Sequence, residues 1–161
     1  MAETYGDLEG FRAWADDRGY SYPLGSGADA EIDAALLKAT DYLEGRYRTR
    51  WKGRKTDSTQ ALAWPRKNVR DEDGVLLDDD VIPTRVIHAS YEATRRILDG
   101  IDLQPDLERG GAVKREMVKA GPVETETEYS DNAAVLTSFT SIDGLLAGLI
   151  RTTATVWLER V

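Results

Sequence analysis

The stretch DAEIDAALLKATDYLEGRYR, residues 29–48, decides the fold, because its apolar residues recur at the three- and four-residue spacing of one helix face. That face consists of Ile32, Leu36, Ala39 and Leu43, joined by Ala35 and Tyr42. Asp29 can cap the amino end. Arg46 and Arg48 suit the carboxyl end, because the helix macrodipole is negative there. The stretch therefore predicts a long helix with one buried face.

Three further segments predict helices around this one. Asp7–Arg18 is a short helix stopped by Gly19, and the last helix starts at Ser141. A third main helix starts near Pro83, with Asp80 or Thr84 as its cap, and ends at Asp99-Gly100. The buried faces expected for the three are, in chain order, Leu8, Phe11, Trp14 and Ala15; Val86, Ala89, Ala93 and Ile97; and Ile142, Leu145, Leu146, Leu149 and Ile150. The buried face of the helix that starts near Pro83 should largely exclude its charged residues, which are Arg85, Glu92, Arg95 and Arg96.

The period changes from helical to two after Gly110-Gly111, which predicts a β-hairpin over residues 112–130 that turns at Ala120-Gly121-Pro122. Cations on its first strand can pair with glutamates on its second. A two-stranded hairpin is marginal alone, so it needs the body or a neighbouring subunit to pack on. The residues proposed for this hairpin interface are Lys114, Arg115, Glu124, Glu126 and Glu128.

The sequence thus predicts a mainly α fold, a small helical bundle with a protruding β-hairpin and an extended C-terminal tail. We expect one domain over residues 1–161, made of a helical body (1–109), a hairpin arm (110–131), and a C-terminal helix with a docking tail (132–161). A length of 161 residues fits one domain.

The composition excludes several classes of protein. There is no cysteine, which excludes disulfides, thiol catalysis and thiolate metal sites. No apolar run approaches the roughly 20 residues of a membrane span, and the start of the chain lacks the pattern of a signal peptide. We therefore expect no membrane partner and no export. The net charge of -8 opposes binding of nucleic acid by the whole surface, so any such contact must be local.

The basic segment Arg46–Lys55 reverses that charge locally, with six cations and the two rings of Tyr47 and Trp51. Its contact residues are proposed to be Arg46, Arg48, Arg50, Trp51, Lys52, Arg54 and Lys55. Three interpretations stay open: phosphate and base contacts to nucleic acid, an acidic protein partner, or a solvated loop that balances the acids at 71–80. Trp51, between Arg50 and Lys52, is expected to be partly exposed or buried only at an interface. Trp14, Tyr42 and Trp64 are expected in the core.

Catalytic and metal-binding patterns are scarce, and we expect a protein that is not an enzyme and needs no cofactor or metal. The single histidine, His88, lies within a predicted helix and is a poor candidate base. The acidic run Asp78–Asp80 lacks the alternating acids, central Gly and terminal Glu of a calcium loop. Gly53-Arg54-Lys55-Thr56 departs from a phosphate-binding loop, because Arg54 separates Gly from Lys and residue 48 is Arg where Gly is required.

Specific strings resemble a family of tailed-phage proteins over about residues 5 to 150. They are Lys38–Tyr47, Trp51–Lys55, Thr59–Arg66 with its Gln-Ala-Leu-Ala-Trp-Pro-Arg motif, Ile82-Pro83, and Leu103–Val113 followed by Lys114-Arg115-Glu116. Family members resemble the head-tail connector, or neck adaptor, and are often labelled DnaT-like single-stranded-DNA-binding proteins.

The resemblance to the connector implies a dodecameric ring below the portal of the virion, assembled in the host cytoplasm. Its expected partners are the portal protein, the next neck protein, and genomic DNA that passes through the channel without sequence-specific binding. The resemblance also makes the tail, with Trp157, Leu158 and Val161, the proposed portal anchor. The label implies the alternative, a single-stranded-DNA-binding replication accessory protein. The acidic body favours the connector, because an acidic channel does not grip DNA.

Overall fold

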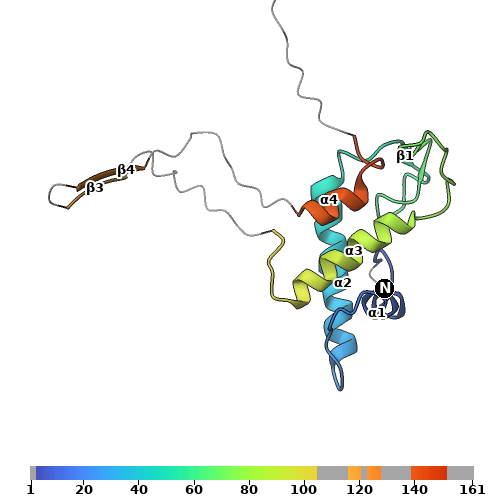
Figure 1. Ribbon diagram of the computed structural model, residues 1–161. Coiled ribbons are helices and arrows are strands. Elements are labelled where there is room, and N and C mark those ends of the chain that lie inside the picture. Colours follow the sequence, from blue (N-terminus) through green and yellow to red (C-terminus); the bar gives the residue numbers. More distant parts are fainter. Residues whose placement is uncertain (1–2, 105–115, 121–122, 128–138, 152–161) are drawn as a thin grey trace, which may run out of the picture. The chain divides into compact units, whose positions relative to one another are not determined.

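The computed structural model describes residues 3–104, 116–120, 123–127 and 139–151. The chain divides into two compact units, one of Met1–Leu103 with Phe139–Val161 and one of Gln104–Ser138. The first unit holds the helices and the second holds a two-stranded hairpin (Figure 1). This confirms the prediction of a mainly helical fold with a small hairpin. None of the helices in these described ranges combines the length and apolar composition needed to cross a membrane.

The helical unit is built around α2 (Ala28–Tyr47), which packs against α3 (Thr84–Leu98) (Figure 1). Helix α4 (Thr140–Leu146) packs on α3, and the short α1 (Leu8–Asp16) contacts both α2 and α3. One core cluster surrounds Leu43, Trp64 and Val86, and a second beneath α1 contains Phe11 and Leu36. The predicted apolar faces of α1, α2 and α3 line these two clusters.

The ends of the helices differ in part from the prediction. Asp7 does cap α1, where its side chain accepts a hydrogen bond from the backbone N–H of Gly10 at 2.8 Å. Asp29, however, lies inside the first turn of α2, because Gly27 with φ of 90° occupies the capping position, two residues before the predicted cap. Pro83 takes the capping position of α3, so neither Asp80 nor Thr84 caps it.

Helix α4 is shorter than its apolar pattern suggests and ends at Leu146. Leu149 and Ile150 are nevertheless buried, because the chain turns at Gly148 (φ 84°) and Ile150 forms a single antiparallel bridge with Trp51. Leu149 and Ile150 are thus buried, as their spacing predicts, although they lie outside the helix.

The segment between α2 and α3 contains two short strands that the sequence did not predict. β1 (Arg54–Lys55) pairs antiparallel with β2 (Arg66–Lys67). Strands of two residues leave no periodic signal, so the periodicity of the sequence does not predict them.

The second unit contains β3 (Glu116–Ala120) and β4 (Val123–Thr127), paired antiparallel from Ala120 and Val123 at the turn to Glu116 and Thr127. The hairpin is therefore confirmed for these residues, with Lys119 opposite Glu124 in the register and Met117 opposite Glu126. Lys114, Arg115 and Glu128, and the tail residues Trp157, Leu158 and Val161, lie outside the described residues.

Candidate interaction surface

The two aromatic rings of the basic segment lie in the core, which corrects the expectation for Trp51. The side chain of Trp51 is only 1% exposed, and that of Tyr47 is fully buried. The Trp51 ring centroid lies 5.8 Å from that of Tyr47 and 5.7 Å from that of Trp64, the latter in an edge-to-face arrangement. The chain turns after the last residue of α2, where the backbone N–H groups of Arg50 and Trp51 donate to the Tyr47 carbonyl at 2.8 and 3.2 Å, and the ring of Trp51 lies in the core although Arg50 and Lys52 flank it.

The cations of the basic segment divide into exposed and engaged side chains. Arg48 and Arg54 are exposed. The guanidinium groups of Arg46 and Arg50 lie 5.7 and 5.5 Å from the centroid of the buried Tyr47 ring, so they cover the core as well as carrying charge. Lys55 donates to the carbonyl of Gln60 at 2.9 Å.

The Gln-Ala-Leu-Ala-Trp-Pro-Arg motif fixes the loop that carries these cations. The side-chain amide of Gln60 donates to the carbonyls of Leu62 and Pro65, both at 2.9 Å. The buried guanidinium of Arg66 donates to three carbonyls, those of Lys52 at 2.7 Å, Gly53 at 2.9 Å and Ala63 at 3.2 Å. The motif therefore serves structure, because it holds the chain on both sides of β1.

A half-buried acid of α2, Glu44, anchors the same loop to that helix. The carboxylate of Glu44 accepts hydrogen bonds from the Tyr5 hydroxyl and from the backbone N–H of Ala63, the latter at 2.9 Å. The Tyr5 oxygen accepts from the backbone N–H of Trp64 at 3.2 Å. Burial, reinforced by Glu44, raises the pKa of Tyr5, so the phenol stays neutral and donates.

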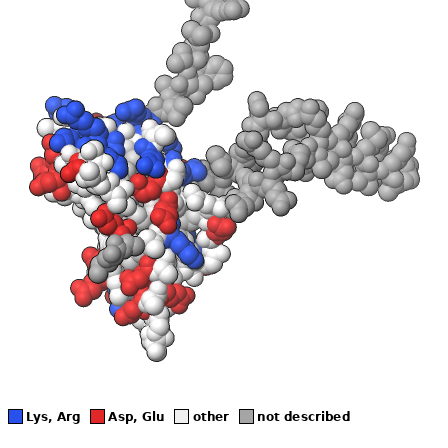
Figure 2. All heavy atoms as spheres, turned by 180° about the vertical axis from the view of Figure 1, so that it is seen from behind, with Lys and Arg blue, Asp and Glu red and all other residues white. Residues whose placement is uncertain are grey.

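Charge is unevenly distributed over the helical unit. The sequence holds nine Lys or Arg and one Asp between residues 46 and 70, but ten Asp or Glu and three Lys or Arg between residues 3 and 44. On the face shown in Figure 2, cations gather toward the end that carries β1, and acids predominate toward α1 and the start of α2. The helical unit thus has an acidic end at α1 and the start of α2 and a cationic end beyond the carboxyl end of α2.

A shallow pocket of about 470 Å³ lies at the cationic end, and its lining comes from three segments distant in sequence. Lys52, Arg70 and Arg151 supply three positive charges. The one acid, Asp71, is engaged by the backbone of its own turn, where it accepts from the N–H groups of Asp73 and Val75. The remaining lining residues are Gly53, Asn68 and Leu76. Sequence reasoning missed Arg70 and Arg151, because nothing local links them to the basic segment.

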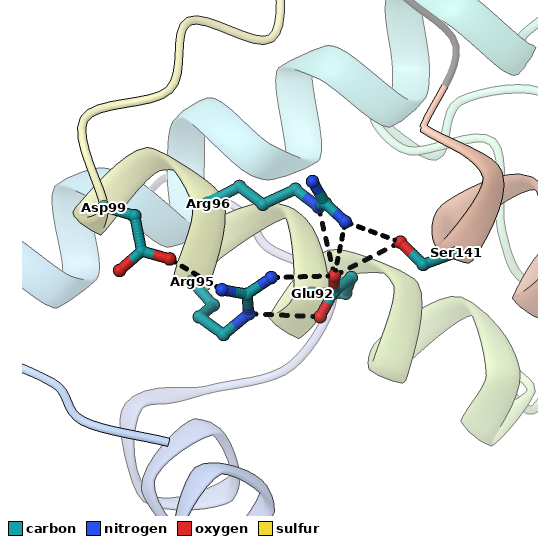
Figure 3. Close-up of polar contacts among 5 residues, drawn as sticks. All are labelled: Glu92, Arg95, Arg96, Asp99 and Ser141. Carbon is teal, nitrogen blue, oxygen red and sulfur yellow. Dashed lines mark hydrogen bonds and ion pairs between the residues drawn. The ribbon is translucent and has the colours of Figure 1, made fainter.

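The five residues of Figure 3 form a polar network that joins α3 to the start of α4. Glu92 was expected off the buried face, yet its side chain is buried, with the residue 6% exposed. Its carboxylate accepts from Arg95 and Arg96 at 3.0 Å and from the Ser141 hydroxyl at 3.2 Å. Arg95 also pairs with Asp99 at 2.6 Å. Burial alone would raise the pKa of Glu92, but Arg95, Arg96 and Ser141 together hold it below its ordinary value.

His88 and the acidic run Asp78–Asp80 are the two other candidate sites that the sequence offers. His88 lies half-buried on α3 beside the rings of Trp14 and Tyr91, and burial, with Arg18 nearby, lowers its pKa. Asp78, Asp79 and Asp80 are exposed. Among the residues that the structure describes, no three acidic or histidine side chains gather as a metal site would require. None of the ion pairs found there joins the basic segment to the acids at 71–80.

Comparisons with known proteins give one match. A family model described as "Putative DnaT-like ssDNA binding protein" matches residues 1–161. No curated protein and no solved structure matches the chain.

Proposed function

The chain belongs to this DnaT-like ssDNA-binding family, and from that premise we propose that it is a structural head-tail connector of a tailed phage. In this role it forms a ring, expected to hold twelve copies, below the portal. The ring extends the DNA channel and joins the capsid to the tail through the next neck protein. The Lys38–Tyr47 and Thr59–Arg66 strings resemble a family of tailed-phage proteins whose members are similar to neck adaptors, and this resemblance supports the choice.

The burial of Tyr47 and Trp51 carries the proposal. Proteins that bind single strands stack bases on exposed aromatic rings within a basic groove. Here the rings of the basic segment are at most 1% exposed. The most exposed aromatic side chain of the described residues is Tyr20, at 39%, and Arg95 covers its ring at 4.8 Å. What remains at the surface is charge without stacking platforms, which suits an acidic protein surface better than bases.

The net charge of -8 supports the same choice, because DNA must pass through a connector without being held. The uneven charge of the helical unit adds to this. A subunit with one cationic and one acidic end can contact a neighbour through unlike surfaces, as subunits of a ring do.

Measuring the mass of the complexes that the purified protein forms tests the proposal. The protein is measured alone, with the portal protein, and with a single-stranded oligonucleotide, each at low and at physiological salt. We expect a defined complex with the portal and only weak, salt-sensitive association with the oligonucleotide. Tight oligonucleotide binding without portal binding would contradict the connector.

A single-stranded-DNA-binding accessory protein is the second candidate, favoured by the family's description and by the pocket of Lys52, Arg70 and Arg151. Without aromatic stacking its affinity would come from phosphates, so it should fall steeply with salt. Replacing Arg70 by Glu would then weaken oligonucleotide binding and leave the portal complex unchanged. The connector proposal expects no such selective loss.

A further inference from the structure

The shallow pocket at the cationic end, here the cationic pocket, takes its three cations from three chain segments, two of which a backbone pairing joins. Trp51 and Ile150 form an antiparallel bridge, and both side chains belong to the core. The next residues along the two segments, Lys52 and Arg151, line the pocket instead. The pairing therefore brings two cations from distant parts of the sequence to one opening.

The third cation of the pocket, Arg70, lies beside an exposed leucine. Arg70 and Leu76 form another antiparallel bridge, so their side chains lie on the same face of a short turn. Both residues line the pocket, and Leu76 is 52% exposed. The Lys52 ammonium donates to the carbonyl of Arg70 at 3.3 Å, which joins this turn to the first two cations. The lining thus combines positive charge with one apolar side chain.

The acids near the cationic pocket are engaged by other groups. Asp71 lines the pocket, but its carboxylate accepts from the backbone N–H groups of Asp73 and Val75 at 3.0 and 2.8 Å. The carboxylate of Glu72 accepts from Arg85 at 2.7 Å. None of the ion pairs found among the described residues involves a cation of the pocket. The pocket therefore keeps an excess of positive charge.

The cations of the pocket are crowded and retain free donors. Burial lowers the pKa of the Arg66 guanidinium, and the positive charge of Arg151 lowers it further. Like charges held together repel one another, and an anion that enters the pocket relieves this repulsion. Lys52 and Arg70 each donate to one backbone carbonyl, but an ammonium and a guanidinium carry further N–H groups. Those groups are available to a bound oxyanion.

We propose that the cationic pocket binds an acidic peptide segment of a partner protein, in which carboxylates flank an aliphatic side chain. The carboxylates face Lys52, Arg70 and Arg151, and the aliphatic side chain packs on Leu76. A single strand of nucleic acid is a poorer match, because none of the described residues that line the pocket is aromatic and could stack on a base. The inference deepens the proposed connector by giving the chemistry of the segment that its cationic end takes, and it rests on that proposal for the identity of the partner as a portal or neck protein.

Titration with synthetic peptides tests the pocket in the full-length protein. The probe is the peptide Asp-Glu-Leu-Asp with acetylated and amidated ends. Its matched controls are Asn-Gln-Leu-Asn, which keeps the shape without the charge, and Asp-Glu-Gly-Asp, which keeps the charge without the leucine. Saturation-transfer NMR observed on the peptide detects weak binding whatever the size of the assembly. We expect the probe to bind in a salt-sensitive way, the Gly peptide to bind more weakly, and the neutral peptide not to bind.

Two protein variants locate the binding. Arg151→Glu should weaken binding of the probe about tenfold, because an attraction becomes a repulsion. Arg54→Glu is the matched control, since Arg54 is exposed at the same cationic end and does not line the pocket, and it should change the affinity less than about twofold. Leu76→Ser should weaken binding of the probe but leave the affinity for Asp-Glu-Gly-Asp unchanged. Because the outcome depends on the peptide, it separates a lost contact from a damaged fold.

Four results would overturn the inference. They are no binding of the probe, equal binding of the neutral peptide, equal losses in Arg151→Glu and Arg54→Glu, and an oligonucleotide that displaces the probe and itself loses more affinity in Arg151→Glu. The last would assign the pocket to phosphates. If the portal complex forms while the probe does not bind, this inference is wrong and the proposed function stands. If the probe binds as expected but no portal complex forms, the pocket stands and the connector is wrong.

Discussion

Glu92 connects α3 to the start of α4 through hydrogen bonds. It accepts hydrogen bonds from two arginines of its own helix and from Ser141. A buried carboxylate is costly without partners. Here the partners lower its pKa below the ordinary value, so the ionised form is the one that the fold prefers.

Glu92→Gln should therefore destabilise the protein at neutral pH, by about 1.5–3 kcal/mol, because charge-assisted hydrogen bonds become neutral ones. A carboxyl whose folded pKa is depressed contributes stability above its unfolded pKa, about 4.3, and loses it as the pH falls through the folded pKa. The difference in the free energy of unfolding between the variant and the parent should thus have its full size at pH 7 and become smaller below about pH 4.3. Urea unfolding at both pH values measures it.

Asp41→Asn is the matched control for this change, because Asp41 is exposed on α2. Its effect should stay within about 0.5 kcal/mol. Equal losses in the two variants, or a gap for Glu92→Gln that does not depend on pH, would refute the role given to the network.

At the scale of elements, the close approach of two chain segments at Gly53 matters most for the loop that carries the cations. Gly53 has a φ of 65°, and a Cβ there would lie 2.3 Å from the Lys67 carbonyl oxygen of β2. Gly19 has nearly the same φ, 67°, yet no atom lies within 4 Å of its Cβ position. The two glycines share a backbone conformation, but only Gly53 lies against another segment of the chain.

Gly53→Ala should consequently cost more than Gly19→Ala. The positive φ alone costs roughly 1–2 kcal/mol at either site. At Gly53 the overlap with backbone adds to this and should disrupt the pairing of β1 with β2. Thermal unfolding of the two variants gives the comparison, and hydrogen exchange of the β1–β2 amides locates the damage. Equal losses of stability would show that the close approach has no energetic weight.

Helices were predictable from this sequence because their signal is local. The stripe of Ile32, Leu36 and Leu43 identifies α2 without knowledge of any partner. The burial of Trp51 was not predictable, since it depends on Trp64 and Ile150, far along the chain. The same reason hid the pocket of Lys52, Arg70 and Arg151. The sequence located the cations, but the expectation that Trp51 is partly exposed or buried only at an interface was wrong.

At the scale of the whole molecule, the cationic end is the feature that separates the two candidate functions. Acidic substitutions at Arg48, Arg50 and Arg54 together should weaken assembly with the portal about tenfold or more in Kd, because charge complementarity at an interface is lost. Any affinity for an oligonucleotide should change less. Lys38→Glu, at an exposed position in the middle of α2, is the control and should leave assembly intact. A larger loss of oligonucleotide binding than of assembly would favour the DNA-binding alternative.

The C-terminal tail gives a second prediction at this scale, which rests on the sequence and the proposed function. Deleting residues 152–161 should leave a folded, soluble protein that no longer holds the portal. Burial of Trp157, Leu158 and Val161 could contribute about 1.5–3 kcal/mol each before ordering costs. Multiple copies would make attachment avid. Light scattering with portal protein measures the loss, and retained binding would disprove the anchor.

The edge-to-face pair of Trp51 and Trp64 also provides an optical label. Two indoles whose centroids lie 5.7 Å apart at 83° should couple excitonically and give a paired band in the far-ultraviolet circular dichroism spectrum. The chain has four tryptophans, and replacing Trp157 by Phe leaves Trp14, Trp51 and Trp64, all buried in the helical unit. Their emission should then be blue-shifted and poorly quenched by iodide. Spectroscopy could thus follow this unit's integrity in a mixture without an added dye.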